Sequence, residues 1–94
     1  MTWLFAAQQQ SCDGVCAAAG LACATAVLAS YSRTEACMTE LTDEFAFSCS
    51  AYESSSWSGS PAVNVDNNKC FYAVDGVETS CSIADNARRM CPCS

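Results

Sequence analysis

The chain has 94 residues, nine cysteines and a formal net charge of −6. This length fits one hydrophobic core and not two, so residues 1–94 are expected to form a single disulfide-stapled module. With only four basic residues, the chain lacks the positive surface that nucleic acids or anionic membranes require, so any membrane association is expected to run through a partner.

The N-terminal segment "MTWLFAAQQQ" lacks the basic start and the long apolar run of a secretory signal peptide. We therefore expect either an excised domain or a chain whose leader has been removed. Trp3 is expected to fill part of the core, with its segment lying along the sheet or the helices.

A first helix is predicted to start around Ser11 and Asp13, because a hydroxyl cap followed by an acid is typical of helix starts. Cys12 and Cys16 lie four residues apart and would share one face of this helix. Gly20 is a natural helix end.

Two more helical segments are predicted, over residues 24–31 and 34–45. The uncharged stretch over residues 14–32 is long enough to cross a bilayer. It consists mostly of alanine, glycine, serine, threonine and cysteine, which gain little in hydrocarbon. A membrane span is therefore not expected.

From residue 45 onward the apolar pattern has the period of a strand. Residues 45–52 alternate and predict a strand, residues 53–61 a polar loop, and residues 62–65 a short strand before a turn at Asp66-Asn67-Asn68. The oxygen-bearing residues of that turn, together with Asp75, suit calcium chemically, but they are first of all turn formers.

Residues 70–81 predict a β-hairpin, since two strand-like runs flank Asp75-Gly76. In this register Val74 lies opposite Val77, and Cys70 opposite Cys81. A direct bond between these two cysteines would be strained, so each is expected to reach a helix.

The segment over residues 83–89 predicts a last helical turn before the Cys91-Pro92-Cys93 tail. The expected fold class is α+β: a small disulfide-rich domain with N-terminal helices packed on a small antiparallel sheet that ends in a C-terminal hairpin.

The abundance of cysteine is typical of a disulfide scaffold in an oxidising compartment. The chain has no histidine and no Cys-x2-Cys pair, so zinc chemistry is left with a four-thiolate site from Cys12, Cys16, Cys91 and Cys93. Thiol-redox chemistry is equally poorly supported, because Cys-Pro-Cys is not a Cys-x-x-Cys motif at a helix start. Structural disulfides are the favoured interpretation, and no metal or other cofactor is expected.

The ordered motifs "SCDGVC", "GLAC", "PAV", "KCF" and the closing "RRMCPC" resemble the cysteine-rich segment near the C-terminus of N-acetylglucosaminyltransferase V. Similar modules occur in predicted secreted or surface proteins of algae and other protists. The resemblance runs from Ser11 to Cys93 and implies an architecture and a compartment, but no glycosyl transfer, because the catalytic domain of that enzyme has no counterpart here. It implies four disulfides among eight cysteines: Cys12, Cys16, Cys23, Cys49, Cys70, Cys81, Cys91 and Cys93.

Cys37 falls outside that set and is expected to be unpaired, either as a buried thiol or as a link between two chains. The aromatic residues Trp3, Tyr52, Trp57, Phe71 and Tyr72 suit a sugar-stacking or protein-binding patch. Trp57 is the first candidate, because it stands in a serine-rich loop, and Tyr52 is a weaker one.

The chain is interpreted as a non-catalytic extracellular or lumenal module that binds a protein or glycan partner or takes part in structural assembly. Without histidine, it has no pair for nucleophilic hydrolysis of the usual kind. One alternative is an accessory subunit docked on a larger membrane-associated complex, and another is a small thiol-redox or metal-thiolate protein. Disulfide connectivity, ligand and oligomeric state stay open at this point.

Overall fold

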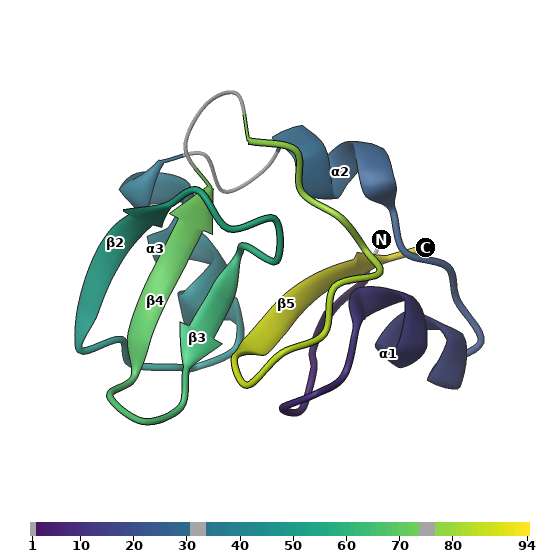
Figure 1. Cartoon of the computed structure of the whole chain (residues 1–94), viewed down its shortest axis with the longest axis horizontal. Coiled ribbons are helices and arrows are strands. Elements are labelled where there is room, and N and C mark those ends of the chain that lie inside the picture. Colours follow the sequence, from purple (N-terminus) through teal and green to yellow (C-terminus); the bar gives the residue numbers. More distant parts are fainter. Residues whose placement is uncertain (1, 31–33, 74–76) are drawn as a thin grey trace.

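The computed structural model describes residues 2–30, 34–73 and 77–94, which form three helices and a five-stranded sheet (Figure 1). In chain order the elements are β1 (Thr2–Phe5), α1 (Cys12–Ala18), α2 (Thr25–Ser30), α3 (Glu35–Glu44), β2 (Ala51–Ser55), β3 (Ala62–Asn64), β4 (Lys69–Ala73) and β5 (Arg88–Cys93). The α+β, disulfide-rich fold class predicted from the sequence is confirmed.

The strands are ordered β1-β5-β3-β4-β2, so the first and last strands of the chain lie side by side. Neighbouring strands are antiparallel except for β2 and β4, which run parallel and make the sheet mixed rather than wholly antiparallel. Because β1 pairs with β5, both ends of the described chain are fixed in the sheet.

Helix α1 begins at the cap that the sequence predicted, and α3 has a similar cap that was not predicted. The Ser11 side chain accepts a hydrogen bond from the backbone N–H of Gly14 (3.1 Å) and caps α1. In the same way, Thr34 accepts from the N–H of Cys37 (3.2 Å) and caps α3. Among the described residues, no helix is long and apolar enough to span a membrane.

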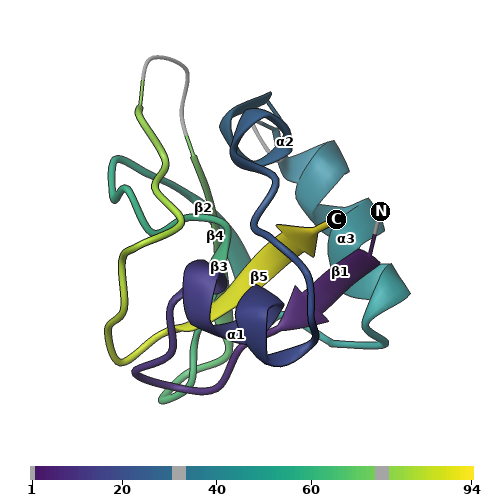
Figure 2. The same cartoon turned by 90° about the vertical axis from the view of Figure 1, so that its right-hand side faces the viewer.

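The two faces of the sheet bury two separate apolar clusters. Helix α3 lies behind the sheet in Figure 1 and covers a cluster that includes Met38, Leu41, Val63, Cys70 and Met90. Helices α1 and α2 cover the opposite face only over β5 and β1, as the side view in Figure 2 shows. That opposite face is called the front face below, and over β2, β4 and β3 no helix of the described residues covers it.

The predicted strand over residues 45–52 is wrong in its position, because β2 starts only at Ala51. Ala46 has a positive φ of 52°, which ends α3 in a turn. Phe45 and Phe47 instead pack around Phe5 from a loop, with ring centroids 5.2 and 5.6 Å away. The alternating apolar pattern in this segment therefore comes from a loop whose two phenylalanine side chains pack into the core, and not from a strand. The predicted polar loop is accordingly shorter, since its first three residues belong to β2.

In the described part of the predicted hairpin over residues 70–81, the strand is β4, which ends at Ala73. Residues 77–81 form no strand, and Val74, Asp75 and Gly76 lie outside the described residues. The short strand β3 and the turn at residues 66–68 agree with the prediction. In that turn the side-chain oxygens of Asn64 and Asn67 accept backbone hydrogen bonds from Asp66 and Lys69 (2.9 and 3.0 Å), so they act as turn formers.

The predicted helical turn over residues 83–89 is wrong, and the expected C-terminal tail is the strand β5. Pro92 is tolerated there because its carbonyl oxygen, and not an N–H group, makes the contact on that side: it accepts from the N–H of Ala24 (2.8 Å). This segment is a strand because it pairs with β1, and the local sequence carries no signal of that long-range pairing.

Candidate binding groove and disulfide framework

Four disulfides join eight cysteines, and they connect segments that are far apart in the sequence. The pairs are Cys12–Cys91, Cys16–Cys93, Cys23–Cys81 and Cys49–Cys70. Cys37 is half-buried on α3 and carries a free thiol. These eight are the cysteines that the family resemblance implied. Four disulfides in so short a chain are consistent with an oxidising or extracellular environment.

Cys70 and Cys81 do not bond to each other, as expected, but neither reaches a helix. Cys70 bonds to Cys49, which lies between α3 and β2, and Cys81 bonds to Cys23, which lies between α1 and α2. The helical cysteines Cys12 and Cys16 bond instead to β5.

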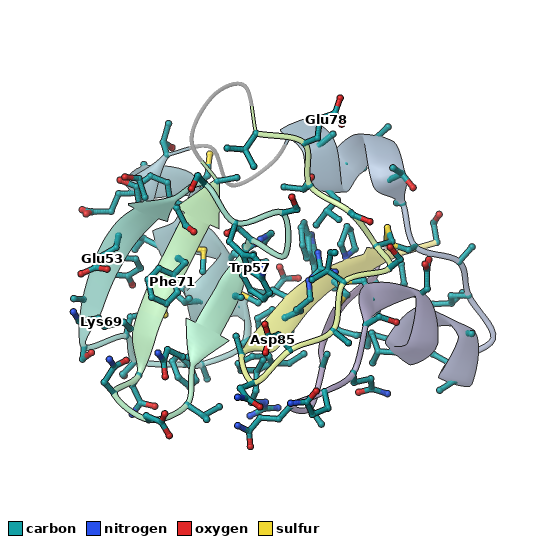
Figure 3. The ribbon with its side chains drawn as sticks, in the orientation of Figure 1. Glu53, Trp57, Lys69, Phe71, Glu78 and Asp85 are labelled. Atoms are coloured by element: carbon teal, nitrogen blue, oxygen red, sulfur yellow. A yellow bond between two sulfur atoms is a disulfide. The ribbon has the colours of Figure 1, made fainter. Side chains whose placement is uncertain are left out.

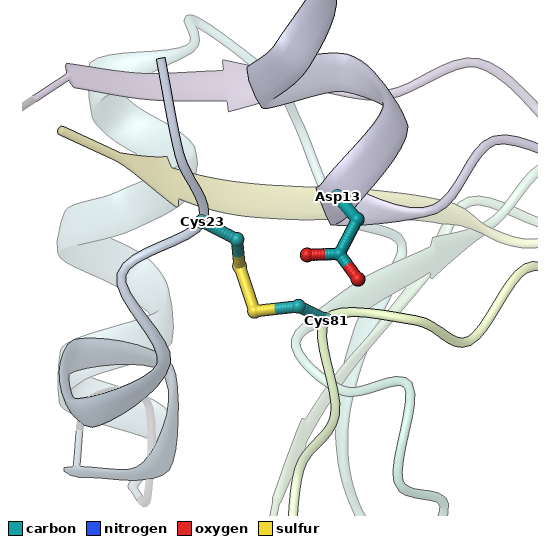
Figure 4. A group of neighbouring side chains, drawn as sticks. All are labelled: Asp13, Cys23 and Cys81. Carbon is teal, nitrogen blue, oxygen red and sulfur yellow. A yellow bond between two sulfur atoms is a disulfide. The ribbon is translucent and has the colours of Figure 1, made fainter.

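The four sulfur atoms considered for a zinc site are consumed in two disulfides, Cys12–Cys91 and Cys16–Cys93. Within the described residues, the only group of three or more metal-binding side chains whose ligand atoms lie within 4.8 Å of one another is Asp13, Cys23 and Cys81 (Figure 4). Two of those three sulfur or oxygen donors are bonded to each other as a disulfide and carry no thiolate charge. The arrangement therefore offers a metal ion one carboxylate.

The aromatic residues proposed from the sequence fall on opposite sides of the sheet. Trp3, Tyr52 and Tyr72 pack against the cluster beneath α3. The hydroxyl of Tyr52 is hydrogen-bonded to that of Thr42, 3.2 Å away. Trp57 and Phe71 lie together on the front face. The alternation of side chains along a strand accounts for the division within β4, because Phe71 points opposite to its neighbour Tyr72.

Trp57, whose side chain is labelled in Figure 3, lines two adjoining hollows on the front face. The larger has a volume of about 370 Å³ and is lined by Ser55, Trp57, Asn64, Asp66, Phe71, Asn86 and Ala87. The smaller has a volume of about 300 Å³ and is lined by Trp57, Asp85, Asn86 and Ala87. The two hollows share three lining residues, and together they are called the Trp57 groove.

The indole of Trp57 is half-buried, and its position is fixed by its own loop. The backbone N–H of Trp57 donates to the hydroxyl of Ser55 (3.0 Å), and its carbonyl accepts from the N–H of Ser60 (3.2 Å). The ring lies against Gly59, where a Cβ atom would come within 2.4 Å of two indole carbons. The absence of a side chain at position 59 is therefore a condition for this placement of the indole.

The second wall of the groove, around Asp85 and Asn86, is held by hydrogen bonds from the N-terminal loop. The N–H of Gln9 donates to the carbonyl of Asp85 (2.8 Å), and the side-chain amide of Gln8 donates to the carbonyl of Asn86 (2.8 Å). The side-chain amide of Gln9 also donates to the Asn86 side-chain oxygen. The N-terminal loop thus fixes a wall that lies more than seventy residues away in the sequence.

Arg89 joins both walls beneath the groove. Its side chain is fully buried on β5, with Nε donating to the carbonyl of Gly59 (2.8 Å) and Nη1 to that of Ile83 (3.0 Å). Desolvation by burial lowers the pKa of Arg89 to about 10, and the charge of Asp13 partly offsets this. The guanidinium is therefore still charged at neutral pH, but it faces the interior.

The charges at the groove are predominantly acidic, since Asp66 and Asp85 line it and both are exposed. Lys69 lies on the same face, but it is paired with Glu53 at 3.1 Å (Figure 3). Arg88 points to the other face of the sheet, where its guanidinium carbon lies 3.8 Å from the centre of the Phe5 ring. Among the described residues, no cation at the groove lacks an acidic or carbonyl partner.

Sequence reasoning identified Trp57 and Phe71 but missed Gly59, Asn86 and Arg89. The "WSG" sequence carried a signal for Gly59, because a glycine two residues after an aromatic residue in a loop permits close packing. Nothing local marked Asn86 or Arg89, whose roles depend on contacts with Gln9 and Gly59. No protein-family model matches the chain, and no curated protein is significantly similar to it.

Proposed function

We propose that this protein is a non-catalytic, disulfide-held module of an extracellular or lumenal compartment that binds a glycan in the Trp57 groove. The observation that carries the proposal is the placement of Trp57 and Phe71 beside the amides of Asn64 and Asn86 in one open groove. Aromatic rings offer apolar surface for the C–H faces of a pyranose, and amide and carboxylate groups pair with its hydroxyls.

Binding is favoured over glycoside hydrolysis because of the environment of the two carboxyl groups in the groove. A general acid at neutral pH needs a carboxyl group whose pKa is raised by an apolar, desolvated pocket. Asp66 and Asp85 are both exposed. They are therefore suited to accept hydrogen bonds from a ligand.

The proposal is tested by glycan binding in a Trp3→Phe background, where Trp57 is the remaining tryptophan of the two in the chain. A bound sugar is expected to shift the fluorescence emission of Trp57. Trp57→Ala should lower the affinity at least about tenfold, because aromatic anchors dominate such contacts. Trp57→Phe, which keeps a ring, should retain part of the binding.

Glu40→Ala is the matched control, because Glu40 is exposed on α3 behind the sheet. It should leave the affinity unchanged, and thermal melts should show that each variant is folded. Binding that is equally strong in Trp57→Ala, or that occurs only with protein partners, would exclude a glycan site in this groove. Release of cleaved sugar during incubation would contradict a non-catalytic role.

A further inference from the structure

We infer that the Trp57 groove selects an extended, non-anionic oligosaccharide, with at least one sugar unit in each of its two hollows. This inference rests on the proposed function, and it adds the length and the charge class of the ligand.

The length follows from the shape of the groove. Two hollows of about 300 and 370 Å³ share the lining residues Trp57, Asn86 and Ala87 and therefore adjoin. Each volume is at the lower end of the range found for small-molecule sites. A single sugar unit would fill one hollow and leave the other to water. A chain that extends from one hollow into the other would place adjacent units in both, with Trp57 beside each of them.

Each hollow also has its own polar groups, so both can fix the orientation of a unit. The smaller contains the exposed carboxylate of Asp85, and the larger contains Asn64 and Asp66 beside Phe71. Asn86 lines both and is held in place by Gln9. A ligand with hydroxyls repeated along its length can pair with both sets at once.

The charge class follows from the acidic lining. An anionic sugar placed near Asp66 or Asp85 would be repelled by the negative charge of these carboxylates, because both line the groove. No compensating cation lies ready among the described residues: Lys69 is paired with Glu53, and Arg89 is buried below the groove. Neutral sugars, or sugars bearing a protonated amine, meet no such penalty.

The test is a printed array of neutral, amino, sulfated, sialylated and uronic-acid glycans, followed by titration of the best-bound class from the monosaccharide to the hexasaccharide. Only neutral or amino glycans are expected to bind. Affinity should rise at least about tenfold between one and three units and then level off. Trp57→Ala should lower the affinity for the oligosaccharides at least about tenfold.

A charge variant tests the acidic lining directly. Asp85→Asn keeps the side-chain oxygen that accepts the N–H of Asn86 but removes the charge. It should raise the affinity for a uronic-acid oligosaccharide severalfold relative to its neutral counterpart. Glu78→Gln removes the same charge from an exposed residue that does not line the groove, and it should change neither affinity (Figure 3).

The outcomes separate this inference from the proposed function. Trp57-dependent binding of sulfated, sialylated or uronic-acid glycans would overturn the charge class. A monosaccharide that binds as tightly as the oligosaccharides would overturn the two-hollow arrangement. In both cases the glycan-binding function would stand. A complete lack of Trp57-dependent glycan binding would instead remove the function and, with it, this inference.

Discussion

At the scale of single residues, the proposed binding surface depends on the contact between Trp57 and Gly59. A Cβ atom at position 59 would lie 2.4 Å from two indole carbons and 2.7 Å from a third. Atoms that are not bonded do not approach so closely, so an alanine must displace the ring. Gly59 has no positive φ that would itself disfavour an alanine, so the effect should fall on Trp57 and not on the loop backbone.

Gly59→Ala is therefore expected to move the indole out of its place and weaken glycan binding at least about tenfold while the fold persists. The measurements are fluorescence emission in the Trp3→Phe background, affinity and thermal unfolding. Gly14→Ala is the matched control. In α1 a Cβ at that position meets its nearest neighbour, the Ser11 hydroxyl oxygen, at 3.4 Å. It should add about 0.5–1 kcal/mol to the unfolding free energy and leave binding intact. Unchanged binding by Gly59→Ala would show that the position of the indole is unimportant.

At the scale of elements, two neighbouring disulfides hold α1 on β5. The bonds Cys12–Cys91 and Cys16–Cys93 close loops of 79 and 77 residues, yet either one alone would bring the two elements together. When one bond is intact, the other closes a ring of only about eight residues. Their contributions to stability should therefore be strongly coupled.

Replacing both cysteines of either bond by alanine should lower the unfolding free energy by roughly 2.5 kcal/mol, and removing both bonds by roughly 6 kcal/mol. The excess over the sum of the single losses, about 1 kcal/mol, arises because only the second removal opens the larger ring, which the intact Cys23–Cys81 bond limits to about 21 residues. Urea unfolding of the two single-bond variants and of the variant that lacks both bonds measures this excess. The Cys49–Cys70 bond, which spans 21 residues, is the independent comparison, and its loss should cost roughly 3 kcal/mol. Strictly additive losses for the α1–β5 bonds would contradict this account.

At the scale of the whole molecule, 94 residues bury too little surface to tolerate the loss of every crosslink. The four disulfides differ in accessibility. All cysteines of the α1–β5 bonds are fully buried, whereas Cys23 and Cys49 are half-buried. The exposed carboxylate of Asp13 lies within 4.8 Å of both sulfur atoms of Cys23–Cys81 and should repel an anionic thiolate.

Limited reduction of the folded protein by glutathione should therefore open Cys49–Cys70 first, Cys23–Cys81 second and the α1–β5 bonds last. Alkylation and peptide mapping follow the order, and full reduction should abolish the cooperative melt. Before reduction, the unfolded chain should show one reactive thiol, at Cys37. Asp13→Asn should speed opening of Cys23–Cys81 selectively. Early opening of a buried bond, or a melt that survives full reduction, would contradict this prediction.

The sequence by itself determined the features that depend on neighbours along the chain. The caps at Ser11 and Thr34 and the turn before Lys69 follow from local hydrogen bonding, so they were predictable. Cysteine content indicated a disulfide scaffold. Side-chain type also indicated Trp57 and Phe71 as candidate binding residues. It could not predict that these two lie on one face of the sheet while Tyr52 lies on the other.

Only the tertiary structure decided the features that depend on distant pairing. Arg88–Cys93 is a strand because β1 lies beside it, and Phe45 and Phe47 leave the strand pattern because Phe5 packs between them. The Trp57 groove exists because Arg89 and Gln9 hold its two walls across long sequence separations. A contact between residues far apart in the chain is stabilised by the burial and pairing of both, so neither segment alone contains the information that specifies it.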